Sequence, residues 1–226
     1  MIHLTSVEAS VSFENGKIVV RLPITRPTSK IRVKKIENGV GIPVSTRKKS
    51  FPSDENLRDY YIEWQISYAR DGKYDYELSR MVRLAHEHGI LTYNDIYELL
   101  KFADDVKSYL EDKGIRREST NEELYGFNIY EDVYPVAKKE LPSGEFIGIV
   151  LKHKQRAVGY QSMVYVCIPL TNVEPSLAGR VARRNEVVKY EVPVDLMKEL
   201  LKAFIIASET HKNDIVKFLR SIIGTS

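Results

Sequence analysis

Residues 58–70, RDYYIEWQISYAR, contain the clearest strand pattern in this chain of 226 residues. Large aromatic and aliphatic side chains, among them Trp64, alternate with a second set that includes Glu63. Because successive side chains of a β-strand point to opposite faces of the sheet, the alternation predicts one long strand. The turn sequence DGK at 71–73 is expected to end it.

Further strands are expected on both sides of this segment. The runs at about 3–13 and 17–24 flank ENG, a sequence typical of a hairpin turn. A third run, about 29–37, leads into the turn NGVG, and the section 127–170 returns to strand patterns such as FIGIVLKHK and SMVYVCIPL. The segment VVKYEVPV, 187–194, reads as another strand.

Helical periodicity appears in two pairs of segments. The first pair, about 75–88 and 93–112, has a glycine within two residues of each end, and glycine is the preferred residue just past a helix. The second pair covers about 194–207 and 211–223, and a short helix is expected at 175–184.

The order of these elements indicates an α+β fold. Strands are interleaved with runs of helices without regular βαβ alternation, which favours a mainly antiparallel sheet with flanking helices. No repeat and no linker rich in Pro, Gly or Ser divides the chain, so residues 1–226 are expected to form a single domain.

The composition is that of an ordinary soluble globular protein, with 43% hydrophobic and 29% charged residues. The single cysteine, Cys167, excludes an internal disulfide and lies in an apolar run, as expected for a buried thiol in a reducing compartment. No apolar run approaches the ~18 residues of a membrane span, and MIHLTSVEAS at 1–10 has no signal-peptide pattern. We therefore expect a cytoplasmic protein that is not attached to a membrane.

Basic residues are clustered, although the net charge is only +3. Strand alternation places Lys30, Arg32 and Lys34 on one face of their strand, with Ile31 and Val33 on the other. The same rule places a second basic set, Lys152, Lys154 and Arg156, on one face of another strand. Residues 47–49 and 180–184 are also basic. Basic runs are often only solvated faces, but basic strands in a chain with 14 tyrosines and one tryptophan also fit a surface that neutralises phosphates and stacks bases.

The stretch SETHKNDIVKFLRSII, residues 208–223, places a histidine and an aspartate three positions apart where a helix is expected to begin. In the first turn, His211 and Asp214 would share one face and could touch. The simpler alternative is that Asp214 complements the positive end of the helix dipole while His211 is solvated.

The sequence contains no recognisable motif for binding a nucleotide cofactor or a metal ion. The chain has no phosphate-binding loop of the form GxxxxGK[ST], and the histidines of HEH at 86–88 face away from each other on a helix without other ligands nearby. We expect no cofactor and no metal site. A nuclease-like pattern of two acids and a lysine can be fitted to Asp54, Asp71 and Lys73, although DGK is also a plain turn.

A dispersed set of polar residues remains. It comprises Arg32, Glu63, Tyr68, Lys154, His211 and Asp214. Each has a structural alternative, such as a salt bridge between Arg32 and Glu63 on neighbouring strands. Together they supply a base with an orienting acid, a phenol, a guanidinium and an amine, which are the groups that metal-free cleavage of an N-glycosidic bond requires.

The segments KIRVKK, YYIEWQISYAR, IVLKHKQR and SETHKND resemble those of the PabI-type restriction DNA glycosylases, over essentially the whole chain. The resemblance implies a half-pipe fold, in which a strongly curved antiparallel sheet and its helices form a homodimer around duplex DNA. It implies metal-independent excision of adenine from 5′-GTAC-3′, with a DNA methyltransferase as the functional partner that protects the host. It also implies that Arg32, Glu63, Tyr68, His211 and Asp214 form the active site, and that Lys154 cleaves the strand after base removal.

The residues expected to contact DNA are chosen by charge, aromatic character and position. They are Lys30, Lys34, Trp64, Arg70, Lys152 and Arg156. Two other functions stay open on the residues alone. One is a metal-dependent type II restriction endonuclease that uses Asp54, Asp71 and Lys73, and the other is a non-catalytic nucleic-acid-binding protein.

Overall fold

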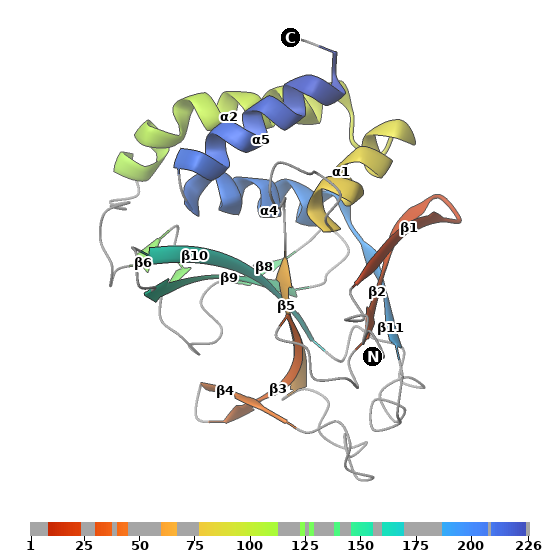
Figure 1. Ribbon diagram of the computed structural model, residues 1–226, viewed down its shortest axis with the longest axis vertical. Helices are drawn as coiled ribbons and strands as arrows, with labels where there is room; N and C mark the ends of the chain where they lie inside the picture. The colour runs from red at the N-terminus through yellow and green to blue at the C-terminus, as the bar shows by residue number, and fades with distance from the viewer. Residues whose placement is uncertain are drawn as a thin grey trace, which may run out of the picture.

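The structure is a computed structural model, and it describes part of the chain. The described residues are 9–23, 30–37, 40–44, 60–66, 77–112, 123–124, 127–128, 138–140, 146–155, 160–169, 187–207 and 209–224. Within them, antiparallel sheets and α-helices form the α+β fold expected from the sequence (Figure 1).

The larger sheet has six strands in the order β4-β3-β5-β10-β9-β8, and every neighbouring pair is antiparallel. Its strands are β3 (Ile31–Glu37), β4 (Val40–Pro43), β5 (Tyr60–Ile66), β8 (Lys138–Glu140), β9 (Phe146–Gln155) and β10 (Tyr160–Pro169). Strand β5, the segment with the clearest alternation, lies in the interior of the sheet between β3 and β10. In Figure 1 β9 and β10 run across the view while β5 runs down it, so the sheet is strongly twisted.

A second sheet has three strands in the order β1-β2-β11. They are β1 (Ser10–Glu14), β2 (Lys17–Pro23) and β11 (Val187–Val192), and a separate short pair joins β6 (Glu123–Leu124) to β7 (Phe127–Asn128). Asn15 and Gly16 connect β1 to β2 with φ angles of 50° and 80°. Two successive positive φ angles are what a tight hairpin turn requires, which confirms the prediction from ENG.

The helices gather in one layer beside the large sheet (Figure 1). They are α1 (Glu77–Glu87), α2 (Tyr93–Asp112), α4 (Val194–Ala207) and α5 (Glu209–Ile222). All four were predicted with bounds within two residues. None of the helices in the described ranges is long and apolar enough to cross a membrane.

The start of α2 shows how sequence fixes one of these helices. Thr92 accepts a hydrogen bond from the backbone N–H of Asp95 at 3.2 Å, and Asp95 accepts one from the backbone N–H of Thr92 at 2.9 Å. This reciprocal cap satisfies donors that a helix start otherwise leaves unpaired. Lys198 of α4 also contacts Asp95, at 2.8 Å, and so joins α4 to α2.

The hydrophobic core lies between the helices and one face of the large sheet. Ile31 and Val33 of β3 and Trp64 of β5 contribute from the sheet, and Leu99 and Leu200 from the helices. Cys167 of β10 is also buried, as expected. The inward positions of β3 and β5 are therefore those that alternation had predicted to be apolar.

Several sequence-based expectations lie outside the described residues. They are the helix at 175–184, the basic segments 47–49 and 180–184, the extension of β5 to residue 70, and the residues Tyr68, Arg70, Arg156, Asp54, Asp71 and Lys73.

Candidate active site

Strand pairing in the large sheet aligns the residues of the candidate site. Arg32 of β3 is paired with Glu63 of β5, and Glu63 is paired on its other side with Cys167 of β10. Since Ile31 and Val33 enter the core, the alternate positions Arg32 and Lys34 belong to the opposite face of the strand. Arg32, Lys34 and Glu63 therefore share the face that points away from the helices.

Glu63 forms an ion pair with Lys34, not with Arg32. The Nζ of Lys34 lies 3.1 Å from the Oε2 of Glu63, and the two side chains are only 2% and 7% exposed. The residue directly opposite Lys34 is Tyr61, so the ion pair runs diagonally between neighbouring strands. A buried charge requires a close counter-charge, and these two residues supply one to each other.

This pairing corrects two expectations. The sequence favoured Arg32 as the partner of Glu63 and assigned Lys34 to DNA. Lys34 is instead buried, and an ammonium group enclosed beside a carboxylate is not presented to a phosphate. The sequence singled out both Glu63 and Lys34. Strand alternation gives the face on which Lys34 lies, but it could not show that the side chain of Lys34 is buried there.

Arg32 differs from Lys34 although it lies two residues away on the same face. Its side chain is exposed, and within the described part of the chain it forms no hydrogen bond or ion pair. A guanidinium carries five N–H donors and keeps its charge, so Arg32 can receive an anion or a base edge from outside the protein.

Trp64 does not lie on a surface that could stack on DNA. Its side chain is fully buried among the core residues, and its indole Nε1 has no hydrogen-bond partner in the described part of the chain. The expected contact of Trp64 with DNA is incompatible with this burial. Lys30, at the start of β3, is partly exposed, and its carbonyl accepts a hydrogen bond from the backbone N–H of Gln65 at 2.7 Å.

His211 lies in the first turn of α5, as the sequence predicted. Its ring contacts Phe204 of α4 edge to face, with 5.5 Å between ring centroids. Burial lowers the pKa of His211, and the negative charge of Asp214 acts in the opposite direction. The imidazole is therefore neutral at neutral pH and able to accept a proton, with Asp214 close enough to influence it.

The described residues form two separate groups. Helix α5 packs on α4 and α2, whereas β3 lies at the opposite end of the view in Figure 1. Arg32 and Glu63 belong to the sheet, and His211 and Asp214 to the helical layer. Within the described residues, α5 packs mainly on other helices, so the two groups belong to different layers of the fold.

Lys154 and Lys152 belong to β9, at positions opposite Gln161 and Met163 of β10. Cys167, the residue opposite Glu63, is six positions after Gln161 on β10. At about 3.3 Å per residue, the backbone of Lys154 lies roughly 20 Å along the sheet from that of Glu63. Lys154 and Glu63 are therefore not parts of one compact cluster.

The histidines of HEH have local structural contacts. The Nδ1 of His86 lies 3.3 Å from the carbonyl oxygen of Leu91, and the ring of His88 stacks on Phe13 at 3.7 Å between centroids. Both contacts agree with the structural interpretation. The described residues contain no group of three or more His, Cys, Asp or Glu that could hold a metal ion.

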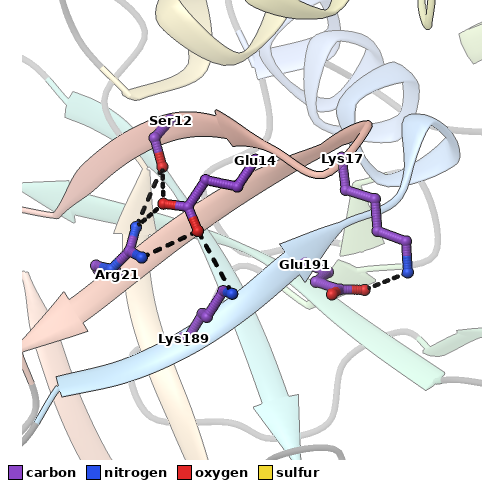
Figure 2. Close-up of polar contacts among 6 residues, drawn as sticks. All are labelled: Ser12, Glu14, Lys17, Arg21, Lys189 and Glu191. Atoms are coloured by element: carbon purple, nitrogen blue, oxygen red, sulfur yellow. Dashed lines mark hydrogen bonds and ion pairs between the residues drawn. The ribbon is translucent and has the colours of Figure 1, made fainter.

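A network of ion pairs on the smaller sheet did not emerge from the sequence (Figure 2). Glu14 accepts hydrogen bonds from Arg21 and Ser12 and is paired with Lys189 at 3.4 Å, while Lys17 is paired with Glu191 at 2.7 Å. The hydrogen bond from Arg21 is the largest cause that lowers the pKa of Glu14, to about 2. Each of these charges is therefore paired with an opposite charge at the surface of the smaller sheet.

Comparisons with known proteins give a consistent result. No protein-family model matches the chain, and neither does any curated protein. A crystal structure of the restriction endonuclease PabI matches with 98% identity and a TM-score of 0.76, covering 97% of this chain and 100% of that one. A complex of R.PabI(Y68F-K154A) with double-stranded DNA containing GTAC has 99% identity, a TM-score of 0.75, and coverage of 95% and 99%. The restriction DNA glycosylase R.CcoLI has 26% identity, a TM-score of 0.63, and coverage of 90% and 95%.

Proposed function

Because the chain belongs to the PabI family of restriction enzymes, we propose that it is a restriction DNA glycosylase that excises adenine from 5′-GTAC-3′ in duplex DNA without a metal ion. The observation that carries the proposal is the near-identity to R.PabI, which has been crystallised with GTAC-containing duplex DNA. The similarity to R.CcoLI, a restriction DNA glycosylase, favours base excision over direct hydrolysis of the phosphodiester.

The variant used for that complex also supports the proposal. It carries Y68F and K154A, and this chain has tyrosine and lysine at the same two positions. Removing the phenol and the amine to hold an enzyme on its target is expected if both groups take part in the chemistry. R.PabI has also been crystallised with nonspecific DNA, so the proposed search for GTAC begins from sequence-independent binding.

The target adenine has to leave the duplex before its glycosidic bond can be attacked. Extrusion of a base costs a few kcal/mol, which contacts with the backbone and with the extruded base must offset. Among the described residues, Arg32 is open to such a contact. Adenine offers an acceptor at N7, and the guanidinium of Arg32 can donate a hydrogen bond to it, with the carboxylate of Glu63 held beside Arg32 on the same face of the sheet.

Cleavage of the bond between C1′ and N9 develops positive charge on the sugar, and water then adds to C1′. We assign His211 as the base that takes a proton from this water, with Asp214 orienting the imidazole and Tyr68 holding the water. Adenine leaves with the bonding electrons on N9 and takes up a proton from solvent, and the proton that His211 takes from the water is returned to solvent. General-base assistance of this type contributes about 10²–10⁴-fold to the rate. The neutral state of His211 at neutral pH supports its assignment.

Strand cleavage is proposed as a second reaction at a separate position. The amine of Lys154 adds to the aldehyde form of the abasic sugar with loss of water, and β-elimination from the resulting imine releases the 3′ phosphate. The separation of roughly 20 Å between the backbones of Lys154 and Glu63 implies that the abasic sugar leaves the excision pocket first. Lys152, Arg70 and Arg156 are proposed to contact the DNA backbone.

The target and the protein are proposed to share a two-fold axis. GTAC is palindromic, so a homodimer can present the same site to each strand. The proposed location is the cytoplasm, where the chain would meet its DNA together with a methyltransferase that modifies the target adenine. A methyl group on N6 would remove one donor from the adenine edge and crowd the pocket.

The experiment that tests the function uses duplex DNA with one GTAC site, incubated with the protein in excess EDTA. Free adenine is quantified by chromatography and strand breaks are assayed before and after alkali. We expect adenine and alkali-labile sites from GTAC, and neither from a duplex with N6-methyladenine in the site. Cutting that needs magnesium and releases no adenine would instead favour a nuclease that uses Asp54, Asp71 and Lys73. Binding without either product would favour a non-catalytic DNA-binding protein.

A further inference from the structure

We propose that Lys34 is a positioning residue for base excision, which fixes the carboxylate of Glu63 and thereby keeps Arg32 available for the extruded nucleotide. This inference rests on the proposed function, in which Arg32 contacts the extruded adenine. It gives Lys34 a role different from the phosphate contact that its place in a basic strand had indicated.

The geometry of the ion pair carries the inference. Arg32 is the residue paired directly with Glu63 across the two strands, at a separation of about 4.5–5.5 Å between Cα atoms. Lys34 is one diagonal step away, yet its Nζ lies 3.1 Å from Glu63 and both side chains are buried. The carboxylate is therefore within ion-pair distance of the lysine, whereas Arg32 forms no ion pair with it among the described residues.

Competition between the two cations follows from this arrangement. A guanidinium opposite a carboxylate is a favourable pair, so Arg32 is placed to compete with Lys34 for the carboxylate of Glu63 and could replace it if Lys34 were absent. Arg32 would then be bound inside the protein and could not reach the DNA. With Lys34 in place, Glu63 has its counter-charge and Arg32 stays exposed.

The ion pair is not needed for stability alone. Removing two charges from water is unfavourable, and apolar side chains of similar volume often stabilise a buried site equally well or better. Lys34 and Tyr61 are both almost fully buried where β3 meets β5, so apolar residues in place of both Lys34 and Glu63 would suit these surroundings. A carboxylate held ionised at a defined place is what the lysine supplies in addition.

The test compares Lys34→Met, Lys34→Arg and Lys35→Met. The first removes the charge, the second retains it, and the third is a control at a neighbouring lysine of β3 that lies over the Tyr60 ring at 5.9 Å. The rate of adenine release is measured in a single turnover with saturating enzyme. Affinity is measured with the same duplex carrying 2′-fluoro-2′-deoxyadenosine at the target, because the fluorine destabilises the positively charged sugar and prevents turnover. All assays are made at a temperature at which circular dichroism shows each variant to be folded.

We expect the substitution of Lys34 to lower the rate of adenine release much more than it weakens the affinity for DNA. We expect Lys34→Met to lower the rate by about 10–100-fold while the Kd changes by less than about threefold, because the DNA backbone supplies most contacts. Lys34→Arg should recover a rate within roughly fivefold of the wild type, and Lys35→Met should behave as the wild type.

Three results would overturn the proposal. They are an unchanged rate in Lys34→Met, an equal loss of rate and affinity, and no recovery in Lys34→Arg. If Lys34→Met does not fold, Lys34→Gln replaces it as the uncharged variant and is judged against Lys34→Arg by the same comparison of rate and affinity. Absence of adenine release from the wild-type protein would refute the proposed function itself, whereas wild-type release with an equally active Lys34→Met refutes only the role of Lys34.

Discussion

The two larger sheets of this protein use charged residues in different ways. On the three-stranded sheet, Glu14 is bound by Arg21 and Lys189, and these three side chains are 30–46% exposed. On the six-stranded sheet, Lys34 and Glu63 form a buried pair, and Arg32 beside them is exposed without a partner among the described residues. In both sheets charged and apolar residues alternate along the strands.

The two sheets differ in whether a charged group without a partner among the described residues remains beside the ion pairs. An exposed network in which each charge has a partner contributes little stability, and each of its charges is already compensated. A buried pair holds its atoms in a defined geometry, and an exposed arginine next to it can bind an external anion or base. The same sequence pattern therefore accompanies a closed network on one sheet and an open site on the other.

The largest expected effect comes from removing one member of the buried pair. Glu63→Leu leaves Lys34 buried without this counter-charge, so the free energy of unfolding should fall by about 3–5 kcal/mol. Adding Lys34→Met should recover most of the loss, because both charges are then absent. Denaturant midpoints of the four proteins in the cycle measure this, and Glu191→Leu on the smaller sheet serves as the control, with a much smaller expected change.

An unchanged stability in Glu63→Leu would mean that another anion takes over the charge of Lys34. The two sheets would then differ in the solvent exposure of their ion pairs but not in the contribution of those pairs to stability.

The next effect concerns DNA affinity. Arg32→Gln should weaken binding to a GTAC duplex by roughly tenfold at low salt, and the slope of log Kd against log salt should fall by about 0.9 if the guanidinium contacts a phosphate. Thermal stability should not change, since the side chain is exposed and unpaired among the described residues. The matched control is Arg21→Gln, because Arg21 is already bound to Glu14. An equal loss of affinity in both variants would indicate a nonspecific effect of net charge.

Strand alternation predicted the direction of side chains well but not their burial. It identified Ile31 and Val33 as core residues and placed Arg32 on the other face, as the structure has them. It could not separate Arg32 from Lys34, because alternation defines the face of a sheet while burial depends on what packs over each position. The expected DNA contact of Trp64 failed for a related reason, since an aromatic side chain on a central strand fits the core as well as a base.

The candidate site was predictable only in part. His211 and Asp214 were recognised because a helix start and three-residue spacing are local features. The relation of these residues to the sheet is a tertiary property, which local patterns do not contain. The six residues were singled out in the sequence as dispersed polar groups, and only the family resemblance assigned them to one active site with a strand-cleaving lysine. In the described parts of the chain, Arg32 and Glu63 belong to the sheet, and His211 and Asp214 belong to α5.

A smaller effect is expected on the pH dependence of the reaction. Asp214 raises the pKa of His211 against the lowering effect of burial. In Asp214→Asn the imidazolium loses this stabilisation, so its pKa should fall further and the acid limb of the rate profile should move to lower pH. Single-turnover adenine release between about pH 4 and 8 measures the shift, with Asp105→Asn on α2 as a control. A limb that moves to higher pH, or does not move, would exclude His211 as the titrating base.

The smallest expected effect lies on the smaller sheet and concerns stability in acid. The pKa of Glu14 is lowered to about 2, first by the hydrogen bond from Arg21 and then by that from Ser12. An acid with a lowered pKa stabilises the folded state above its unfolded pKa of about 4.5, and this contribution disappears as the pH falls toward 2. Glu14→Gln should therefore be slightly less stable than the wild type above about pH 5, and the two should converge near pH 2.

Because the carboxylate of Glu14 is exposed, added salt should reduce this difference in stability. Thermal melts over this pH range measure it, and a difference that persists at pH 2 would mean that Glu14 contributes through packing, so that the smaller sheet would depend on more than its exposed charges.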